Sequence, residues 1–184
     1  MTGQVPDDII LNGESYSLIG LRGQNIFRPE DFGIIPLSAS TACWRGYVMG
    51  YIISDDQLFL NEMQVNTEDP PKINGIEPQM GSRFFKYHFK DLKLKSNFTG
   101  SILLAKDFIK SMYVHMGFQR AIAFRTVIEL NIENGEIILE IDMSKQIEEY
   151  RNNDVDRGAR PRSNSMNDIG KWIEKTFSLD YNFE

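Results

Sequence analysis

The segment around Cys43 combines residue types from which a covalent active site could be built. Cys43 is the only cysteine among the 184 residues, and Arg45 follows it two positions later. A cysteine attacks as the thiolate, so it needs a base within reach, and a neighbouring cation favours the charged form. The histidines available are His88 and His115. One hypothesis is therefore a Cys43-dependent hydrolase or transferase, in which His88 or His115 acts as the base and Arg45 favours the thiolate.

A structural role fits the same residues better. No family-specific signature surrounds Cys43, and a lone cysteine usually packs as a small buried hydrophobe. His115 lies on an expected apolar helical face, where a hydrogen-bonded core histidine is the commoner state. We therefore predict that Cys43, Arg45 and His115 are not catalytic.

Neither a metal ion nor a cofactor is predicted. One cysteine and two histidines far apart in the sequence cannot supply the usual zinc-ligand spacings. The chain has no HExxH pattern, no EF-hand loop and no glycine-rich phosphate loop of the GxGxxG or GxxxxGK[ST] type.

A β-hairpin is strongly indicated at 127–142, because Asn134-Gly135 separates two apolar runs. Asn-Gly favours the two-residue type I′ turn, in which both central residues have φ > 0. Counting outward from the turn gives one apolar face, with the pairs Ile132–Ile137, Leu130–Leu139 and Ile128–Ile141. The pairs on the other face are Glu133–Glu136, Asn131–Ile138, Glu129–Glu140 and Val127–Asp142. One face is expected to lie on a core, and the opposite face is acidic.

The acidic face of this hairpin gives the leading hypothesis for function. Its carboxylates belong to Glu129, Glu133, Glu136, Glu140 and Asp142. Like charges directly across a ladder cost roughly 0.2–1 kcal/mol per pair, so such a face suits either water or a positively charged partner. With a formal net charge of −6 and no catalytic signature, the chain fits a non-catalytic module that docks a basic protein. Small immunity proteins and antitoxins share this physical description, although no sequence match supports the analogy.

Aromatic residues support an alternative, a β-barrel that binds a small ligand. The candidates for its walls are Trp44, Tyr47, Tyr51, Phe59, Phe85, Tyr87 and Phe89. A closed sheet of about eight strands can hold one small ligand, and binding pockets are mostly apolar with a few polar groups. Trp44 and Tyr47 are the binding residues that we single out. A fully packed interior would leave no room for a ligand and would exclude the ligand-binding barrel.

The expected fold class is α+β, with a mainly antiparallel sheet that forms a barrel or sandwich of roughly six to eight strands. Strands are predicted at 15–21, 83–89 and 98–104. A second hairpin is predicted at 44–65, where a turn at Asp55-Asp56 pairs Ile53 with Leu58, Ile52 with Phe59 and Tyr51 with Leu60. One packed helix is predicted at 107–116, with Asp107 as its N-cap and Gly117 as its stop.

The chain is expected to have three parts. Residues 1–144 form the β-rich domain, 145–165 a polar arginine-containing linker, and 166–184 an amphipathic helix and tail. Ser165, with Asp168 three positions on, resembles a capping box. The apolar stripe is made up of Ile169, Trp172, Ile173 and Phe177. This helix should fold back on its own sheet, although it could instead reach a second protomer or a partner groove.

The composition and charge of the chain limit the partners and the cellular location that we expect. A hydrophobic content of 41% and a charged content of 25% are typical of soluble domains. A pI near 5.0 argues against unspecific nucleic-acid binding, which needs a basic surface. No apolar run approaches the ~20 residues of a membrane span, and the first residues do not resemble a secretory signal. A cytoplasmic location without a membrane partner is therefore expected.

Overall fold

The computed structural model describes residues 2–23, 26–153 and 161–181. Over these ranges it has one mixed sheet of ten strands and two α-helices, joined by turns and short 3-10 segments. The strands are β1 (Asp7–Leu11), β2 (Glu14–Gly23), β3 (Tyr47–Ser54), β4 (Gln57–Val65), β5 (Gln79–Met80), β6 (Tyr87–Phe89), β7 (Leu94–Lys95), β8 (Gly100–Phe108), β9 (Phe124–Glu133) and β10 (Glu136–Asp142). The helices are α1 (Ser144–Asn153) and α2 (Met166–Phe177).

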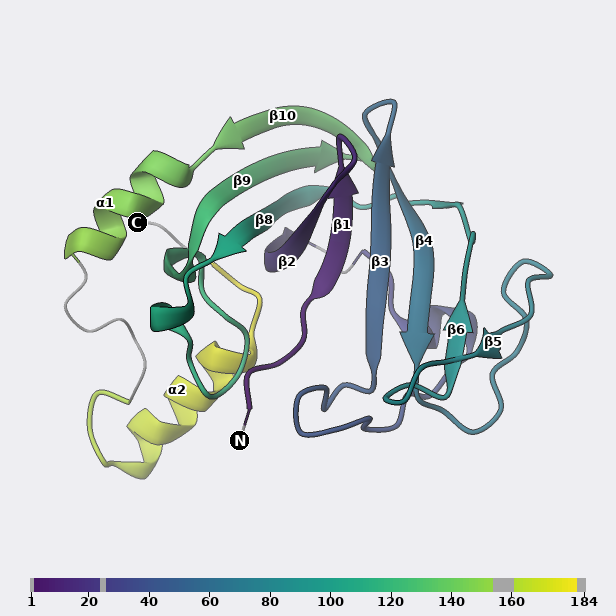
Figure 1. Ribbon diagram of the computed structural model, residues 1–184, viewed down its shortest axis with the longest axis horizontal. Helices are drawn as coiled ribbons and strands as arrows, with labels where there is room; N and C mark the ends of the chain where they lie inside the picture. Colours follow the sequence, from purple (N-terminus) through teal and green to yellow (C-terminus); the bar gives the residue numbers. More distant parts are fainter. Residues whose placement is uncertain (1, 24–25, 154–160, 182–184) are drawn as a thin grey trace.

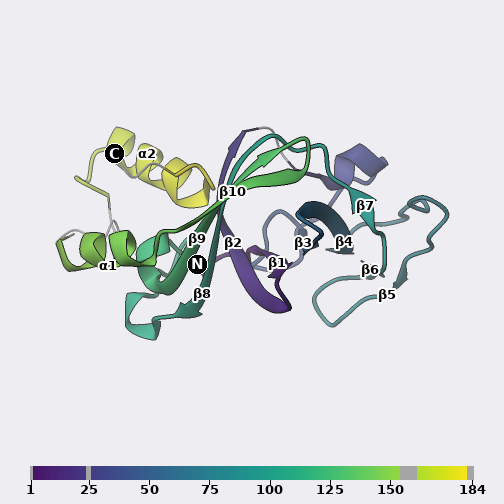
Figure 2. The same cartoon turned by 90° about the horizontal axis from the view of Figure 1, so that it is seen from above.

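Neighbouring strands follow the order β10-β9-β8-β2-β1-β3-β4-β6-β5, with β7 beside β4. Among the described strands, β1 and β3 are the only parallel pair, and the other pairs are antiparallel. The prediction of an α+β protein with a mainly antiparallel sheet is therefore confirmed. Both helices lie at one end of the molecule, beside the curved strands β8 to β10, and β5 and β6 lie at the other end (Figures 1 and 2).

The sheet carries a hydrophobic core on each of its two faces. In β8, Ile102 and Leu104 belong to the larger core, whereas Leu103 and Ala105 belong to the smaller one. This follows from the two-residue period of a strand, which sends successive side chains to opposite faces. The smaller core is completed by Ile147 of α1, which is fully buried. An uninterrupted apolar run therefore marks a strand that is covered on both sides.

The predicted second hairpin is confirmed as β3–β4. Its turn residues Asp55 and Asp56 have φ of 50° and 57°, and the three predicted pairs next to the turn are present. The first strand, β1, lies outside the predicted elements. It forms a hairpin with β2 through Asn12 and Gly13, whose φ values are also positive.

The register predicted for the hairpin at 127–142 is only partly right. Asn134 and Gly135 form the expected turn with positive φ, and Glu133–Glu136 and Ile132–Ile137 are paired. A bulge after Ile137 then shifts the register, and the later pairs are Asn131–Leu139, Leu130–Glu140, Glu129–Ile141 and Ile128–Asp142. The predicted pairs beyond the bulge are therefore wrong. One extra residue in a strand sends the following side chains to the opposite face.

The turn end of this hairpin is hydrogen-bonded to β4 and to the turn that precedes it. Leu58 N–H donates to the Gly135 carbonyl at 2.8 Å, and Ile137 N–H donates to the Asp56 carbonyl at 2.7 Å. The later part of β10 has no such second neighbour among the described residues. The first pairs are thus held on both sides, whereas the rest of β10 is held by β9 alone.

The helix predicted at 107–116 is wrong. Asp107 lies within β8 with a φ of 62°, and its carboxylate accepts a 2.7 Å hydrogen bond from the Thr126 hydroxyl of β9. Phe108 packs edge-on against Phe124, with ring centroids 5.3 Å apart. These contacts across the sheet override the local helical spacing, and only a short 3-10 turn, Lys110–Met112, remains. The packed helix is instead α1, within what was expected to be the start of the linker.

The C-terminal helix and its Ser165 N-cap are confirmed, but the Asp168 carboxylate accepts from the Ser163 hydroxyl instead of completing the predicted capping box. The Ser165 hydroxyl accepts a 3.1 Å hydrogen bond from Asp168 N–H at the start of α2. The chain then returns to its own sheet, where Leu21 N–H donates to the Leu179 carbonyl at 2.8 Å. Neither described helix has the length and apolar character needed to cross a bilayer. The three-part division stays a prediction, and its residues 154–160 and 182–184 lie outside the described ranges.

Replacing Gly20 by alanine should loosen this tail. A Cβ atom at Gly20 would lie 2.5 Å from the Tyr181 ring and 2.8 Å from the Leu103 Cβ. Overpacking of this kind costs roughly 1–3 kcal/mol, so Gly20→Ala should lower the free energy of unfolding in a urea titration by about that amount. Gly170→Ala is the matched control, because its Cβ would meet nothing within 4 Å. In helix α2 it should stabilise by roughly 0.5–1 kcal/mol. Equal effects of the two substitutions would contradict the docking of the tail.

Candidate functional site

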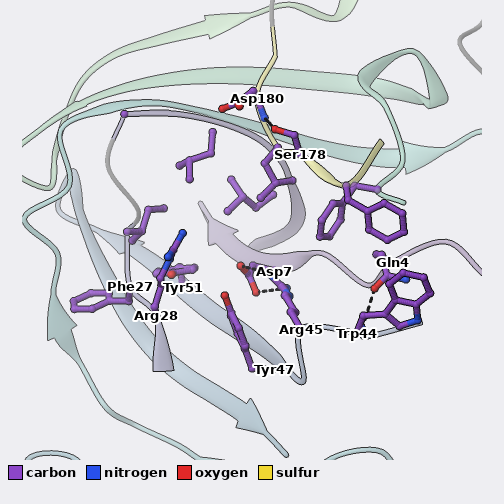
Figure 3. Close-up of a pocket in the computed structure, with 17 residues that line it drawn as sticks. Gln4, Asp7, Phe27, Arg28, Trp44, Arg45, Tyr47, Tyr51, Ser178 and Asp180 are labelled. Atoms are coloured by element: carbon purple, nitrogen blue, oxygen red, sulfur yellow. Dashed lines mark hydrogen bonds and ion pairs between the residues drawn. The ribbon is translucent and has the colours of Figure 1, made fainter. Parts of the chain in front are cut away.

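A groove of about 440 Å³ lies between the starts of β1 and β3 on one side and the C-terminal tail on the other. Figure 3 shows Asp7 and Arg45 joined near the middle of the site. The other labelled residues around them are Gln4, Phe27, Arg28, Trp44, Tyr47, Tyr51, Ser178 and Asp180. The site thus draws on segments from both ends of the chain.

The central contact of the groove is a two-pronged ion pair. The Arg45 Nη1 and Nη2 atoms donate to the two Asp7 carboxylate oxygens, over 3.0 and 2.6 Å. The Oδ1 of Asp7 also accepts from Met49 N–H at 2.6 Å. Asp7 is only 7% exposed, so its charge depends on these donors. The Asp7 carboxylate therefore ties the start of β1 to β3 and to the loop that precedes β3.

Burial and charge act in opposite directions on Arg45. Burial by itself lowers the pKa of Arg45, but the Asp7 charge and its hydrogen bonds outweigh that effect and raise the pKa above its ordinary value. Arg45 is thus a fixed cation, and Asp7 balances its charge.

Aromatic rings surround this pair. The Arg45 guanidinium lies 4.7 Å from the Tyr47 ring centroid and 5.7 Å from that of Phe118. Trp44 stacks on Phe177 of α2, with ring centroids 5.1 Å apart and planes 14° from parallel. Trp44 is 47% exposed although it is a large apolar side chain. Such walls can receive a flat ring by offset or edge contacts.

The loop before β3 is shaped by a glycine between the two functional side chains. Gly46 has a φ of 78°, and a Cβ there would lie 2.1 Å from the Leu37 carbonyl oxygen. Next to it, Trp44 N–H donates to the Gln4 side-chain oxygen at 3.0 Å. A glycine is therefore required to present Arg45 and Tyr47 on successive sides of this bend.

The predicted catalytic candidates do not come together. Cys43 is 3% exposed, and its thiol lies 3.3 Å from the Tyr47 carbonyl oxygen that accepts its hydrogen bond. His88 is instead bonded to Glu62 at 2.9 Å, and the His115 ring packs edge-on against Tyr113. Neither histidine is hydrogen-bonded to Cys43, and Arg45 is engaged by Asp7. Among the described residues, the recorded hydrogen bond of the thiol is the one to the Tyr47 carbonyl.

The five predicted acidic residues are divided between the two faces of the hairpin. Glu133 and Glu136 pair beside the turn, and Glu129 faces Ile141 beyond the bulge. Glu140 and Asp142 lie on the same side as Leu130 and Ile128. The Asp142 carboxylate accepts hydrogen bonds from the side chain and backbone of Ser144, which lower its pKa. A single continuous acidic face is therefore not formed.

Of the seven aromatic residues expected to form a cavity, three line this groove: Trp44, Tyr47 and Tyr51. Phe89 is fully buried in the larger core, and Phe85 packs beside Cys43. The residues that sequence reasoning missed are Gln4, Asp7, Phe27, Arg28, Phe118 and the residues of the tail. The one available signal was Asn12-Gly13, which would have placed β1 and hence Asp7 beside a strand.

Comparisons with known proteins do not identify this site. The chain has no significant match among protein-family models, curated proteins or solved structures. Within the described residues, no three His, Cys, Asp or Glu side chains are grouped so that they could hold a metal ion.

Breaking the ion pair should be costly. Asp7→Asn leaves the Arg45 charge uncompensated, and removal of one partner of a buried pair costs roughly 3–5 kcal/mol. The loss should appear as a lower free energy of unfolding in denaturant. Glu14→Gln is the matched control, since it breaks the exposed pair with Lys106 and should change stability little. Similar small losses for both variants would mean that Asp7 and Arg45 are not tightly held together.

Asp8 gives a pH-dependent test of the same region. Asp8 keeps contact with solvent, but its partial desolvation, together with the neighbouring Asp7 charge, raises its pKa from 3.8 to about 6, and Arg45 opposes the shift. The folded state thus favours protonated Asp8. Its contribution to the free energy of unfolding is therefore fully present below about pH 4 and is lost as the pH rises through about 6. Asp8→Asn should stabilise the protein at pH 8, by less than about 1 kcal/mol because solvent screens the side chain, and should have no effect at pH 3. Asp69→Asn in the loop after β4 is the control. A benefit from Asp8→Asn that is the same at both pH values would contradict this account.

Proposed function

We propose that this protein is a non-catalytic binding module whose groove beside Asp7 and Arg45 receives a small molecule with a planar ring. The observation that carries the proposal is the convergence of aromatic side chains from separate segments on one groove. These side chains are Phe27, Trp44, Tyr47, Tyr51, Phe118 and Phe177. A volume of about 440 Å³ falls within the roughly 300–1,000 Å³ of ordinary small-molecule sites.

The charges of the groove favour a ligand that is neutral overall. Asp7 balances Arg45 at the centre of the site, so no net charge there would attract an ion. The other charged side chains that line the groove are Arg28 and Asp180, one of each sign. A flat ring with polar substituents suits these walls better than a simple anion or cation.

We further propose that seven of the strands form a small closed barrel, and that the ligand binds outside it. The seven strands are β10, β9, β8, β2, β1, β3 and β4, each of which pairs with the next. Closure is supported by the pairing of Glu136 in β10 with Gln57 in β4, because it joins the first of these strands to the last. The larger core fills the space between these strands, with Ile9, Met49 and Leu60 at 0% exposure. Because the interior is packed, a ligand inside the barrel is disfavoured. We therefore place the ligand in the groove at the ends of the strands.

A basic protein partner stays a proposal on different grounds. The carboxylates of the β9–β10 hairpin do not share one face, so a continuous acidic face does not support this partner. The exposed apolar and acidic residues of β10 support it instead. The cytoplasmic location and the oligomeric state stay predictions.

The groove can be tested by saturation-transfer NMR on the full chain, with indole, phenol and adenosine as separate probes. At least one probe should show saturable transfer. Trp44→Ala should weaken its binding roughly two- to twelvefold, because an aromatic pair contributes about 0.5–1.5 kcal/mol. Phe84→Ala is the matched control, since Phe84 is 62% exposed and does not line the groove. No transfer from any probe, or equal binding by the two variants, would argue against the proposal.

A further inference from the structure

The outer edge of β10 is an open strand edge. Beyond Glu136, no described strand pairs with the side of β10 that faces away from β9. Ile137 N–H points to that side, where it donates to Asp56, and Met143 N–H points to the other, where it donates to Val127. Since N–H groups alternate along a strand, the N–H of Glu140 is directed outward. We call residues 138–142 the β10 edge.

The side chains of the β10 edge are unusually apolar for such a place. Ile138, Leu139 and Ile141 are 61%, 49% and 36% exposed. Soluble proteins normally protect exposed edges with lysine, proline or very short strands. Here the strand runs for seven residues and contains neither lysine nor proline. An exposed apolar edge of this kind is a template for a further strand.

Charge decides which strand would fit. The β10 edge carries Glu140 and Asp142, and Glu136 and Glu133 lie exposed at its turn end. A second copy of β10 would bring another set of carboxylates alongside, and like charges across a ladder are unfavourable. An extended segment that alternates apolar residues with lysine or arginine would match both features.

We propose that the β10 edge binds a basic, extended segment of a partner protein by strand addition. Backbone hydrogen bonds to the outward groups would hold the segment, and apolar contacts with Leu139 and Ile141 would add to its affinity. The surrounding carboxylates would select for basic residues and speed the encounter. This surface is independent of the proposed ligand site, because no residue of β10 lines the groove.

The test uses two synthetic peptides of seven residues on the isotope-labelled full chain. The first is acetyl-Lys-Val-Lys-Ile-Arg-Val-Lys-amide, and the second has glutamate at each basic position. The basic peptide should cause saturable amide shifts and slower hydrogen exchange in residues 138–142, and it should bind more weakly as salt is raised. The acidic peptide should not bind.

Two substitutions at one position separate backbone pairing from charge. Glu140→Pro removes the outward N–H without removing a bond to β9, a place where an edge strand tolerates proline, and it should weaken binding at least about tenfold. Glu140→Gln keeps the N–H and should weaken binding at most about fivefold. Glu77→Gln, in the loop before β5, should leave the affinity unchanged. Unperturbed amide shifts in β1 to β4 establish that each variant is folded.

Several outcomes would overturn the proposal. They are the absence of saturable shifts, shifts that map away from β10, equal binding of the acidic peptide, and equal effects of Glu140→Pro and Glu140→Gln. Light scattering adds a further check, because a dimer that Glu140→Pro separates would show that a second copy of the chain occupies the edge.

Discussion

The contact between Asp7 and Arg45 is the constraint on which the rest of the structure depends. A buried carboxylate must be fully satisfied, and here both its oxygens face one guanidinium while one oxygen also takes the Met49 N–H. This arrangement fixes β1 beside β3, the only parallel pair among the described strands. Because β1 also pairs with β2 and β3 with β4, this pair joins the strands from β10 to β2 with β4 in one sheet. It also positions Trp44, which stacks on Phe177 of α2, and Tyr47, whose ring lies beside the Arg45 guanidinium.

The groove and the open edge both follow from how the sheet ends. At the start of β1 and β3, the tail and α2 cover the strands incompletely and leave an aromatic space between them. At the edge of the sheet, Glu136 beside the β9–β10 turn pairs with β4, whereas the rest of β10 pairs only with β9 among the described strands. We propose that the groove at the starts of β1 and β3 receives a flat small molecule, and that the open edge of β10 receives an extended chain. Neither inference requires catalysis.

The elements that could be predicted from sequence were those fixed by local chemistry. The turns at Asp55-Asp56 and Asn134-Gly135 and the Ser165 cap depend on a few adjacent residues, and all three are confirmed. Counting from the turn assumes an unbroken register, so it could not reveal the bulge after Ile137. The expected helix at 107–116 failed for the same reason, since pairing with β9 outweighed its helical spacing. In the site, Trp44 and Tyr47 stood out as bulky residues beside a cysteine, but the partner of Arg45 lies 38 positions earlier, in a strand that was not predicted.

A double-mutant cycle on Asp7 and Arg45 tests the central claim most directly. The free energy of unfolding would be measured in denaturant for the parent chain, Asp7→Asn, Arg45→Met and the combined variant. Our account predicts a coupling energy above about 1.5 kcal/mol, within the range for residues in one buried network, with the combined variant less destabilised than the sum of the two single variants. Additive losses within about 0.5 kcal/mol would contradict it, because the two side chains would then act independently and could not fix the frame of the groove.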